Sequence, residues 1–155
     1  MSSIPGAAAH DAHVAPVRRA AMLVGAVFLL VGVLGFIPGV TSNIALLTGA
    51  GHESGALLLG VFQVSILHNI VHLLFGIAGL AFARSARGAR NYLIGGGVIY
   101  LLLWLYGLFV DPSSSANFVP LNNADNWLHL VLGIGMIVLG VTLGRSRSTA
   151  PTGTP

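Results

Sequence analysis

The chain has 155 residues, of which 55% are hydrophobic and only 7% are charged. Soluble domains carry about 25% charged residues, so this composition excludes a water-soluble globular protein and indicates an integral membrane protein. The formal net charge of +3 comes with seven arginines that all flank apolar stretches, a pattern typical of membrane topology and not of nucleic-acid binding. The chain has no cysteine, which excludes disulfides, thiolate metal sites and cysteine nucleophiles.

The apolar stretches of the chain are long enough for four membrane spans. A helix needs roughly 20 apolar residues, with a range of about 17–25, to cross a bilayer. The sequence therefore predicts an all-α fold, a four-transmembrane-helix bundle that forms one domain over residues 18–144. The small and polar segments 1–17 and 145–155 are predicted to be disordered cytoplasmic tails. The predicted spans are residues 20–37, 66–83, 92–110 and 127–143.

The first span has a competing interpretation as a cleaved signal peptide, because Arg18 and Arg19 precede it. A signal peptide has an apolar core of only about 7–15 residues, followed by an Ala-x-Ala-like cleavage site. This apolar run is longer, and the Phe-Ile-Pro-Gly sequence of residues 36–39 is no such site. An uncleaved first span is therefore favoured.

The segment between the first two spans is harder to interpret. As one helix, residues 57–83 would be about 40 Å long, against a hydrocarbon core of about 30 Å. We therefore expect the second span to begin near Ser65 or His68. The conformation of residues 38–64 stays open, with an interfacial helix, a re-entrant segment and a short strand as the alternatives for residues 57–64.

The arginines predict the orientation of the chain. In a four-span arrangement all seven lie on one side of the membrane, and the two opposite loops contain no Lys or Arg. The positive-inside rule then places both termini in the cytoplasm. The arginine distribution thus predicts a multi-pass membrane protein with both termini on the arginine-rich side.

The segment His68–Ile77 recurs in altered form as Asp125–Ile134. In this alignment Asn69 matches Asn126, His72 matches His129 and Gly76 matches Gly133. The second and fourth spans run in the same direction, so the chain is predicted to consist of two halves with parallel topology and a pseudo-two-fold axis along the membrane normal. A weaker alignment of the first and third spans pairs Gly25 with Gly96 and Leu30 with Leu101.

The repeat predicts a polar layer between the second and fourth spans, in the outer half of the membrane. Its candidate members are His68, Asn69, His72, Asp125, Asn126 and His129. Glycine stripes mark faces where helices approach closely in lipid, and the candidate packing residues are Gly76, Gly79 and Gly133. We therefore expect the second and fourth helices to pack against each other along Gly76 and Gly133, with both matched histidines buried.

Three roles are open for the polar layer. Its side chains could join the helices by hydrogen bonds, with Asp125 capping the fourth helix. Alternatively, His68, His72 and His129 could bind a transition metal or haem in a membrane redox protein. A proton or small-solute pathway is the third hypothesis. No catalytic motif is present and no catalytic residue or cofactor is predicted, which favours a role other than an enzyme.

The two motifs, His-Asn-Ile-Val-His-Leu-Leu-Phe-Gly and Asn-Ala-Asp-Asn-Trp-Leu-His-Leu-Val-Leu-Gly, resemble those of an uncharacterised family of small four-helix bacterial membrane proteins. That family is known only as a domain of unknown function, of the high-GC Gram-positive type. The resemblance covers roughly residues 18–144 and implies an inner-membrane protein without an assigned activity. We expect an accessory or envelope-homeostasis component whose partner is the lipid bilayer. Self-association and a membrane-protein partner stay open.

Overall fold

The computed structural model describes residues 15–144, which form four helices, a small sheet and one short 3-10 turn. The helices are α1 (Pro16–Leu34), α2 (Ile66–Phe82), α3 (Ala86–Phe109) and α4 (Asn123–Leu143). The strands are β1 (Thr41–Ser42), β2 (Leu57–Leu58) and β3 (Phe62–Gln63), and the 3-10 turn η1 covers Ile44–Leu46. The predicted tails are residues 1–17 and 145–155, and all of them except residues 15–17 lie outside the described residues.

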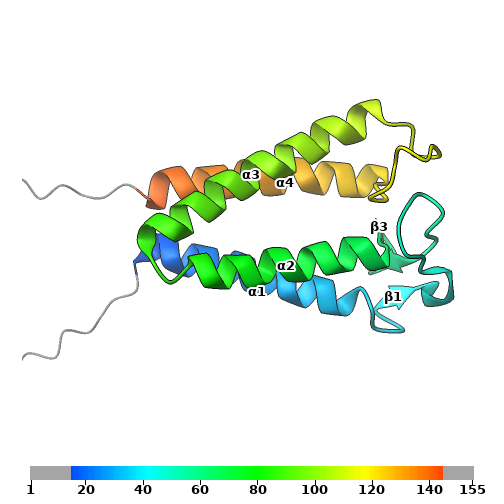
Figure 1. The fold of residues 1–155 in the computed structure, drawn as a ribbon, viewed down its shortest axis with the longest axis horizontal. Coiled ribbons are helices and arrows are strands. Elements are labelled where there is room, and N and C mark those ends of the chain that lie inside the picture. Colours follow the sequence, from blue (N-terminus) through cyan, green and yellow to red (C-terminus); the bar gives the residue numbers. More distant parts are fainter. Residues whose placement is uncertain (1–14, 145–155) are drawn as a thin grey trace, which may run out of the picture.

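The helices pack as two antiparallel hairpins. Figure 1 shows α1 beside α2 and α3 beside α4, and these two pairs make by far the most extensive helix contacts. The hairpins meet mainly where α1 contacts α3. The α1–α2 and α3–α4 connections both lie at the end that carries the strands, whereas the short α2–α3 turn lies at the other end.

Glycine allows the two helices of each hairpin to approach closely. In the first hairpin a Cβ atom at Gly76 would lie 2.7 Å from the carbonyl oxygen of Gly25, and one at Gly79 would lie 2.8 Å from the Cα atom of Gly25. In the second hairpin a Cβ atom at Gly97 would lie 2.7 Å from the carbonyl oxygen of Gly133. The glycine stripes therefore join neighbouring helices within each hairpin.

This arrangement contradicts the expected packing of α2 against α4. Gly76 packs against α1 and Gly133 packs against α3, and α2 and α4 are not among the helix pairs in extensive contact. The prediction was wrong because a small-residue face shows that a helix has a close neighbour but not which helix that neighbour is. The extensive helix contacts are thus made within each half of the repeat, between α1 and α2 and between α3 and α4.

The structure corrects the alignment of the first and third helices by one residue. Gly25 faces Gly76 as Gly97 faces Gly133, so the equivalent of Gly25 is Gly97 and not Gly96. The same register brings Leu29 and Leu101 to corresponding places, each against the repeated glycine of the partner helix. The halves are therefore related by 72 residues in α1 and α3, as from Gly25 to Gly97, and by 57 residues in α2 and α4, as from Gly76 to Gly133.

The helix starts differ from those of the predicted spans because helices can begin before their apolar portions. Helix α1 already begins at Pro16, inside the segment predicted as a disordered tail, and ends at Leu34, before Pro38 and Gly39. Proline suits this start because its missing N–H has no helical partner in the first turn. Helix α3 includes Arg87 and Arg90, since the Ser85 side chain accepts a hydrogen bond from the backbone N–H of Gly88 and caps its first turn.

The start of α2 coincides with the predicted one. The Ser65 hydroxyl accepts a hydrogen bond of 3.1 Å from the backbone N–H of His68. Asn122 caps α4 in the same way, with its side-chain oxygen 2.9 Å from the backbone nitrogen of Asp125. Ser65 and Asn122 are equivalent in the 57-residue register, so the repeat includes the helix caps.

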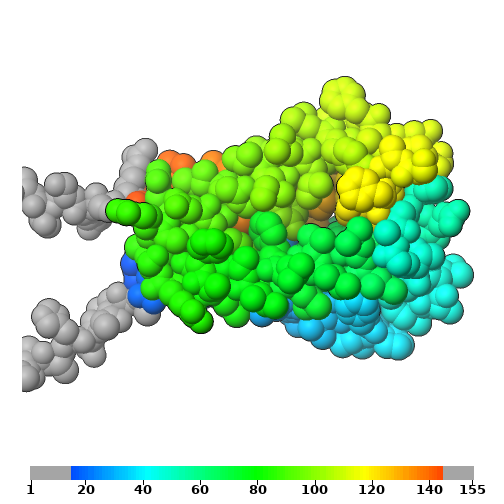
Figure 2. All heavy atoms as spheres, viewed as in Figure 1, coloured from blue at the N-terminus to red at the C-terminus, as the bar shows by residue number. Residues whose placement is uncertain are grey.

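Residues 57–64 form strands, one of the three alternatives left open by the sequence. The antiparallel sheet has the order β1-β2-β3, with Thr41 opposite Leu58 and Leu57 opposite Gln63. Ala56, Leu58 and Val64 form a small buried core beneath it. Figure 2 shows that this segment and the loop that follows α3 cover the end of the molecule opposite the α2–α3 turn, which we call the outer cap (residues 38–64 and 110–122). The words outer and inner refer here to these two ends of the molecule.

Candidate functional site

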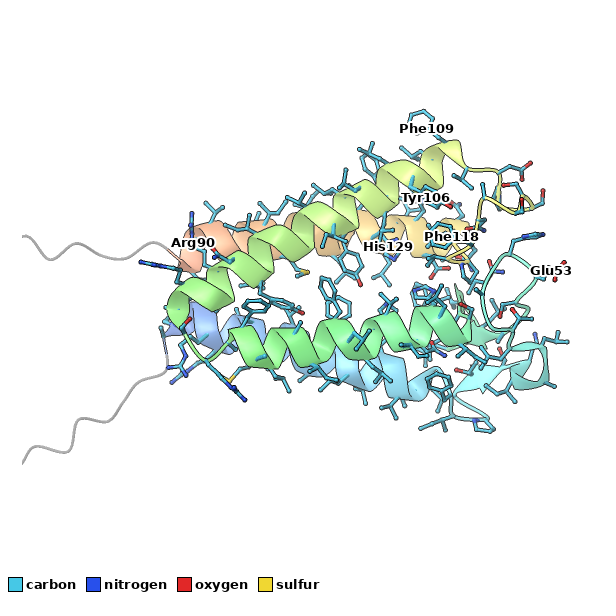
Figure 3. The ribbon with its side chains drawn as sticks, in the orientation of Figure 1. Glu53, Arg90, Tyr106, Phe109, Phe118 and His129 are labelled. Carbon is cyan, nitrogen blue, oxygen red and sulfur yellow. The ribbon has the colours of Figure 1, made fainter. Side chains whose placement is uncertain are left out.

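The outer cap and the hairpins bring three histidines together. His68 and His72 lie one turn apart on α2, with ring centres separated by 4.5 Å. His129 projects from α4 into the space between the hairpins (Figure 3), and its ring centre lies 6.4 Å from that of His68. His68 is 4% exposed and His129 is 3% exposed. His72 is half-buried, so two buried imidazoles and one half-buried imidazole form the histidine layer, although α2 and α4 do not pack directly.

The imidazoles of this layer have unused hydrogen-bonding capacity. The Nδ1 atoms of His68, His72 and His129 are all buried, and none has a hydrogen-bond partner within residues 15–144. A neutral imidazole carries one donor and one acceptor nitrogen, and leaving a buried polar atom unpaired costs about 1–3 kcal/mol. The Nδ1 atoms thus contribute no hydrogen bond between the helices within residues 15–144, and a bonding role for the histidines stays a prediction.

The hydrogen bonds of Asp125 join it to the outer cap and not to the histidines. Its Oδ2 atom accepts a hydrogen bond of 2.9 Å from the backbone N–H of Gln63 and one of 3.1 Å from that of Asn122. The second bond completes a capping box at the start of α4. The Asn122 side chain donates to the carbonyl oxygen of Val61, at 2.7 Å. Two side chains of the second half thus attach the strand segment of the first half.

Asn69 and Asn126 were predicted to lie in the polar layer, but each packs against a glycine of its own hairpin. The side chain of Asn69 lies against Gly35, which caps the end of α1, and that of Asn126 lies against Gly107 on α3. These pairs are equivalent in the repeat, since Gly35 and Gly107 are 72 residues apart. Each asparagine therefore fills the outer end of its own hairpin and does not bond across the molecule. The predicted six-residue layer is reduced to three histidines with Asp125 beside them.

A cavity of about 360 Å³ adjoins the histidine layer, and all three imidazoles line it. Its mouth lies between α1 and α4, where Leu23, Val27 and Leu128 line the cavity and are also exposed on the molecular surface. Its outer end is closed by Leu58 and Phe62 of the strands. Pockets of about 300–1,000 Å³ that are mainly apolar, with a few polar groups, are typical of small-molecule sites.

Aromatic side chains form the inner wall of this cavity. Phe28 and Tyr100, which are equivalent in the 72-residue register, stack with ring centres 5.4 Å apart where α1 meets α3. Phe28 lies 5.7 Å from His72, and Tyr100 lies 5.1 Å from His129, measured between ring centres. Each half of the repeat thus supplies one aromatic ring and one imidazole to a shared wall.

The repeat also predicts a second cavity on the opposite side, between α2 and α3. A smaller one of about 240 Å³ does lie there, lined by Phe75, Tyr92 and Gly96 and by no histidine. Phe75 stands where the other half has Leu132, and its ring packs edge-on against Tyr100 at 5.5 Å between centres. The larger side chain fills the space that would lead to the histidines. All three histidines of the layer therefore line the larger cavity, and none lines the smaller one.

The histidines are not arranged as a compact metal site. Within residues 15–144, no three His, Cys, Asp or Glu side chains lie together in a group that could hold a metal ion. Binding of haem by His68, His72 or His129 stays a prediction. Tyr100 and Phe28, which sequence reasoning had not assigned to the site, could have been found from the corrected 72-residue register, because it pairs two aromatic residues next to the repeated glycines.

These features define the class of protein. Among the described residues, helices α1, α3 and α4 are long and apolar enough to cross a membrane, and α2 is a shorter apolar helix of 17 residues. Large apolar side chains are exposed along all four helices, for example Leu30, Leu74, Leu102 and Val131. The chain is a multi-pass membrane protein.

Comparison with known proteins identifies the family. Residues 18–142 match the domain of unknown function DUF4383, and the chain belongs to this family. No curated protein matches the chain, and no solved structure matches it. The family carries no assigned activity, so the function has to be argued from the cavity itself.

Proposed function

We propose that this chain is a four-span protein of the bacterial plasma membrane that binds a small lipophilic molecule in the histidine-lined cavity. It would act as a binding or accessory component of the cell envelope and not as an enzyme. The observation that supports this proposal is the position of three imidazoles with unpaired nitrogens on the wall of an apolar cavity whose mouth faces the lipid. Ionisable residues at such places in membrane proteins are functional candidates.

The fourth span in this proposal is α2. Its 17 residues rise about 26 Å, close to the hydrocarbon thickness of about 30 Å, and exposed apolar side chains such as Leu74 and Ile77 cover its surface. Arg18 donates a hydrogen bond of 2.8 Å to the carbonyl oxygen of Ala83 at its inner end. Figure 3 shows Arg90 and Glu53 at opposite ends of the molecule, which suits an arginine-rich cytoplasmic side.

Cysteine labelling tests this topology directly, because the chain contains no natural cysteine. The single variants Glu53→Cys and Ser115→Cys are expected to react with a membrane-impermeant maleimide on intact cells, since both positions are exposed in the outer cap. Ala86→Cys, exposed at the start of α3, is expected to react only after the cells are permeabilised. Labelling of Ala86→Cys on intact cells would show that α2 does not cross the membrane.

Blocking the mouth of the cavity tests the binding function. Val27 lines the cavity and is 54% exposed, so Val27→Trp places a large ring at the mouth without disturbing the buried core. Radiolabelled dodecyl amphiphiles are added to protein in phosphatidylcholine nanodiscs, and uptake by empty nanodiscs is subtracted. We expect saturable binding to the wild-type protein and a loss of affinity of at least about tenfold in Val27→Trp, comparable to losing one or two well-packed apolar contacts.

Leu30→Trp is the matched control. Leu30 lies on the same helix one turn further along, is 57% exposed and does not line the cavity. This variant is expected to bind as the wild-type protein does. Equal affinity of the two tryptophan variants would place binding elsewhere on the surface, and the absence of saturable binding by the wild-type protein would overturn the proposed function.

A further inference from the structure

The cavity also indicates what kind of molecule it accepts. We infer that its ligand is a single-chain amphiphile with a neutral, hydroxyl-bearing head, taken from the outer leaflet and held with its head among the three imidazoles. This inference rests on the proposed binding function and adds the chemical class and the orientation of the ligand. Three properties of the cavity support it: its size, its gradient of polarity and the charge of its lining.

The size of the cavity limits the ligand to one chain. A volume of about 360 Å³ lies near the lower end of the range of about 300–1,000 Å³ for drug-sized ligands. A bilayer lipid with two long chains would not fit inside it. The exposed mouth between Val27 and Leu128 would nevertheless let the end of one chain remain in contact with lipid.

Polarity changes along the depth of the cavity. His68 lies just after the cap of α2, at the outer end, beside the strands. Leu23 and Leu132 line the end of the cavity that lies nearer the α2–α3 turn. Leu23 lies eleven residues before the outer end of α1, about 16 Å further from the outer cap at 1.5 Å per residue. A polar outer end and an apolar inner end match the orientation of a lipid in the outer leaflet. Such a molecule can enter sideways without turning over.

The lining selects a neutral head. Neither Arg nor Lys lines the cavity, so a carboxylate or phosphate would have no cation to pair with and would lie near the Asp125 carboxylate. A quaternary ammonium head has no donor for the unpaired imidazole nitrogens. A hydroxyl group is both a donor and an acceptor, so it can bond a neutral imidazole of either tautomer.

The spacing of the rings suits one hydroxyl oxygen. The centres of His68 and His129 are 6.4 Å apart, and neither Nδ1 atom has a partner in the described structure. One oxygen between the two rings can hydrogen-bond to both and remove two unpaired buried groups at once. The rings of Phe28 and Tyr100 flank the histidine layer, with Phe28 5.7 Å from His72 and Tyr100 5.1 Å from His129 between ring centres.

A panel of three amphiphiles with the same chain tests the head-group preference. Dodecanol, dodecanoate and dodecyltrimethylammonium share one tail and differ in charge, and each is titrated into protein with ¹⁵N-labelled histidine in nanodiscs. We expect dodecanol to bind at least about tenfold more tightly than either ion. The imidazole nitrogen signals of His68 and His129 should shift on binding, while those of His52, which does not line the cavity, should not.

Two variants support this test. His68→Phe keeps a ring of similar size but removes its nitrogens, and it is expected to weaken dodecanol binding by about tenfold, the value of one hydrogen bond. His52→Phe is the matched control and should bind normally. If either ion binds as tightly as dodecanol, or if the His68 signals do not move, the head-group inference is wrong while the cavity remains a binding site. If none of the three binds saturably, the proposed function fails as well.

Discussion

Replacing Gly76 with leucine is expected to force α1 and α2 apart and to destabilise the protein strongly. A Cβ atom at this position would lie 2.7 Å from the carbonyl oxygen of Gly25 and 2.7 Å from the backbone nitrogen of Leu29. Both obstacles are backbone atoms, so no side-chain rotation can relieve the contact. Overpacking of this kind costs about 1–3 kcal/mol and occasionally more. We expect a loss of at least about 3 kcal/mol in the free energy of unfolding, measured by denaturant titration in detergent micelles.

Gly95→Leu and Gly135→Leu are the controls for this prediction. A Cβ atom at either position would have no neighbour within 4 Å. Replacing glycine inside a helix removes a penalty of up to about 1 kcal/mol, so both variants should be as stable as the wild-type protein or slightly more stable. A similar loss in Gly95→Leu and in Gly76→Leu would mean that leucine disturbs these helices wherever it is placed, and that α1 and α2 do not meet at Gly76.

The repeat was the most informative feature of the sequence. It paired His72 with His129 and Gly76 with Gly133, and the structure gives each pair equivalent surroundings. Spans two and four carry the strongest sequence similarity because both contribute an imidazole and a capped outer end. The expected membership in a family of unknown function was confirmed over residues 18–142.

The neighbours of the repeated residues could not be read from the same alignment. A repeat shows which positions are equivalent, but an equivalent position may face its own half or the other half. Gly76 and Gly133 face their own halves, and so do Asn69 and Asn126, whereas His68 and His129 approach each other across the molecule. Only packing distinguishes these cases, because glycine, asparagine and histidine all lie on the inner faces of their helices.

The cavity was also beyond sequence reasoning, because it depends on a difference between the halves. Leu132 and Phe75 occupy equivalent positions, and the larger ring fills one side of the molecule while the smaller side chain leaves the other side open. The effect of this difference on the cavity can be inferred only when the register of α1 and α3, against which these side chains pack, is known. The one-residue error in that register hid the pairing of Phe28 with Tyr100, which forms the wall of the site.

The second large effect is expected from Asp125→Ala, which should release the strands from α4. The substitution leaves the backbone N–H groups of Gln63 and Asn122 without the carboxylate oxygen that accepts both of their hydrogen bonds. Leaving a buried donor unpaired costs about 1–3 kcal/mol, and the capping box of α4 is lost as well. We expect about 2–3 kcal/mol lower stability, with faster hydrogen exchange at the amide of Gln63.

The same change should weaken ligand binding, because Phe62 and Leu58 close the outer end of the cavity and lie in the segment that Asp125 attaches. Asp111→Ala is the control, since the Asp111 carboxylate is exposed and accepts hydrogen bonds only from Ser113, two residues away. That variant should keep normal stability and normal affinity for dodecanol. If Asp125→Ala lowers stability but leaves both the Gln63 exchange rate and dodecanol binding unchanged, Asp125 caps α4 alone. The strands would then be held by other contacts, and the outer end of the cavity would not depend on the second half of the repeat.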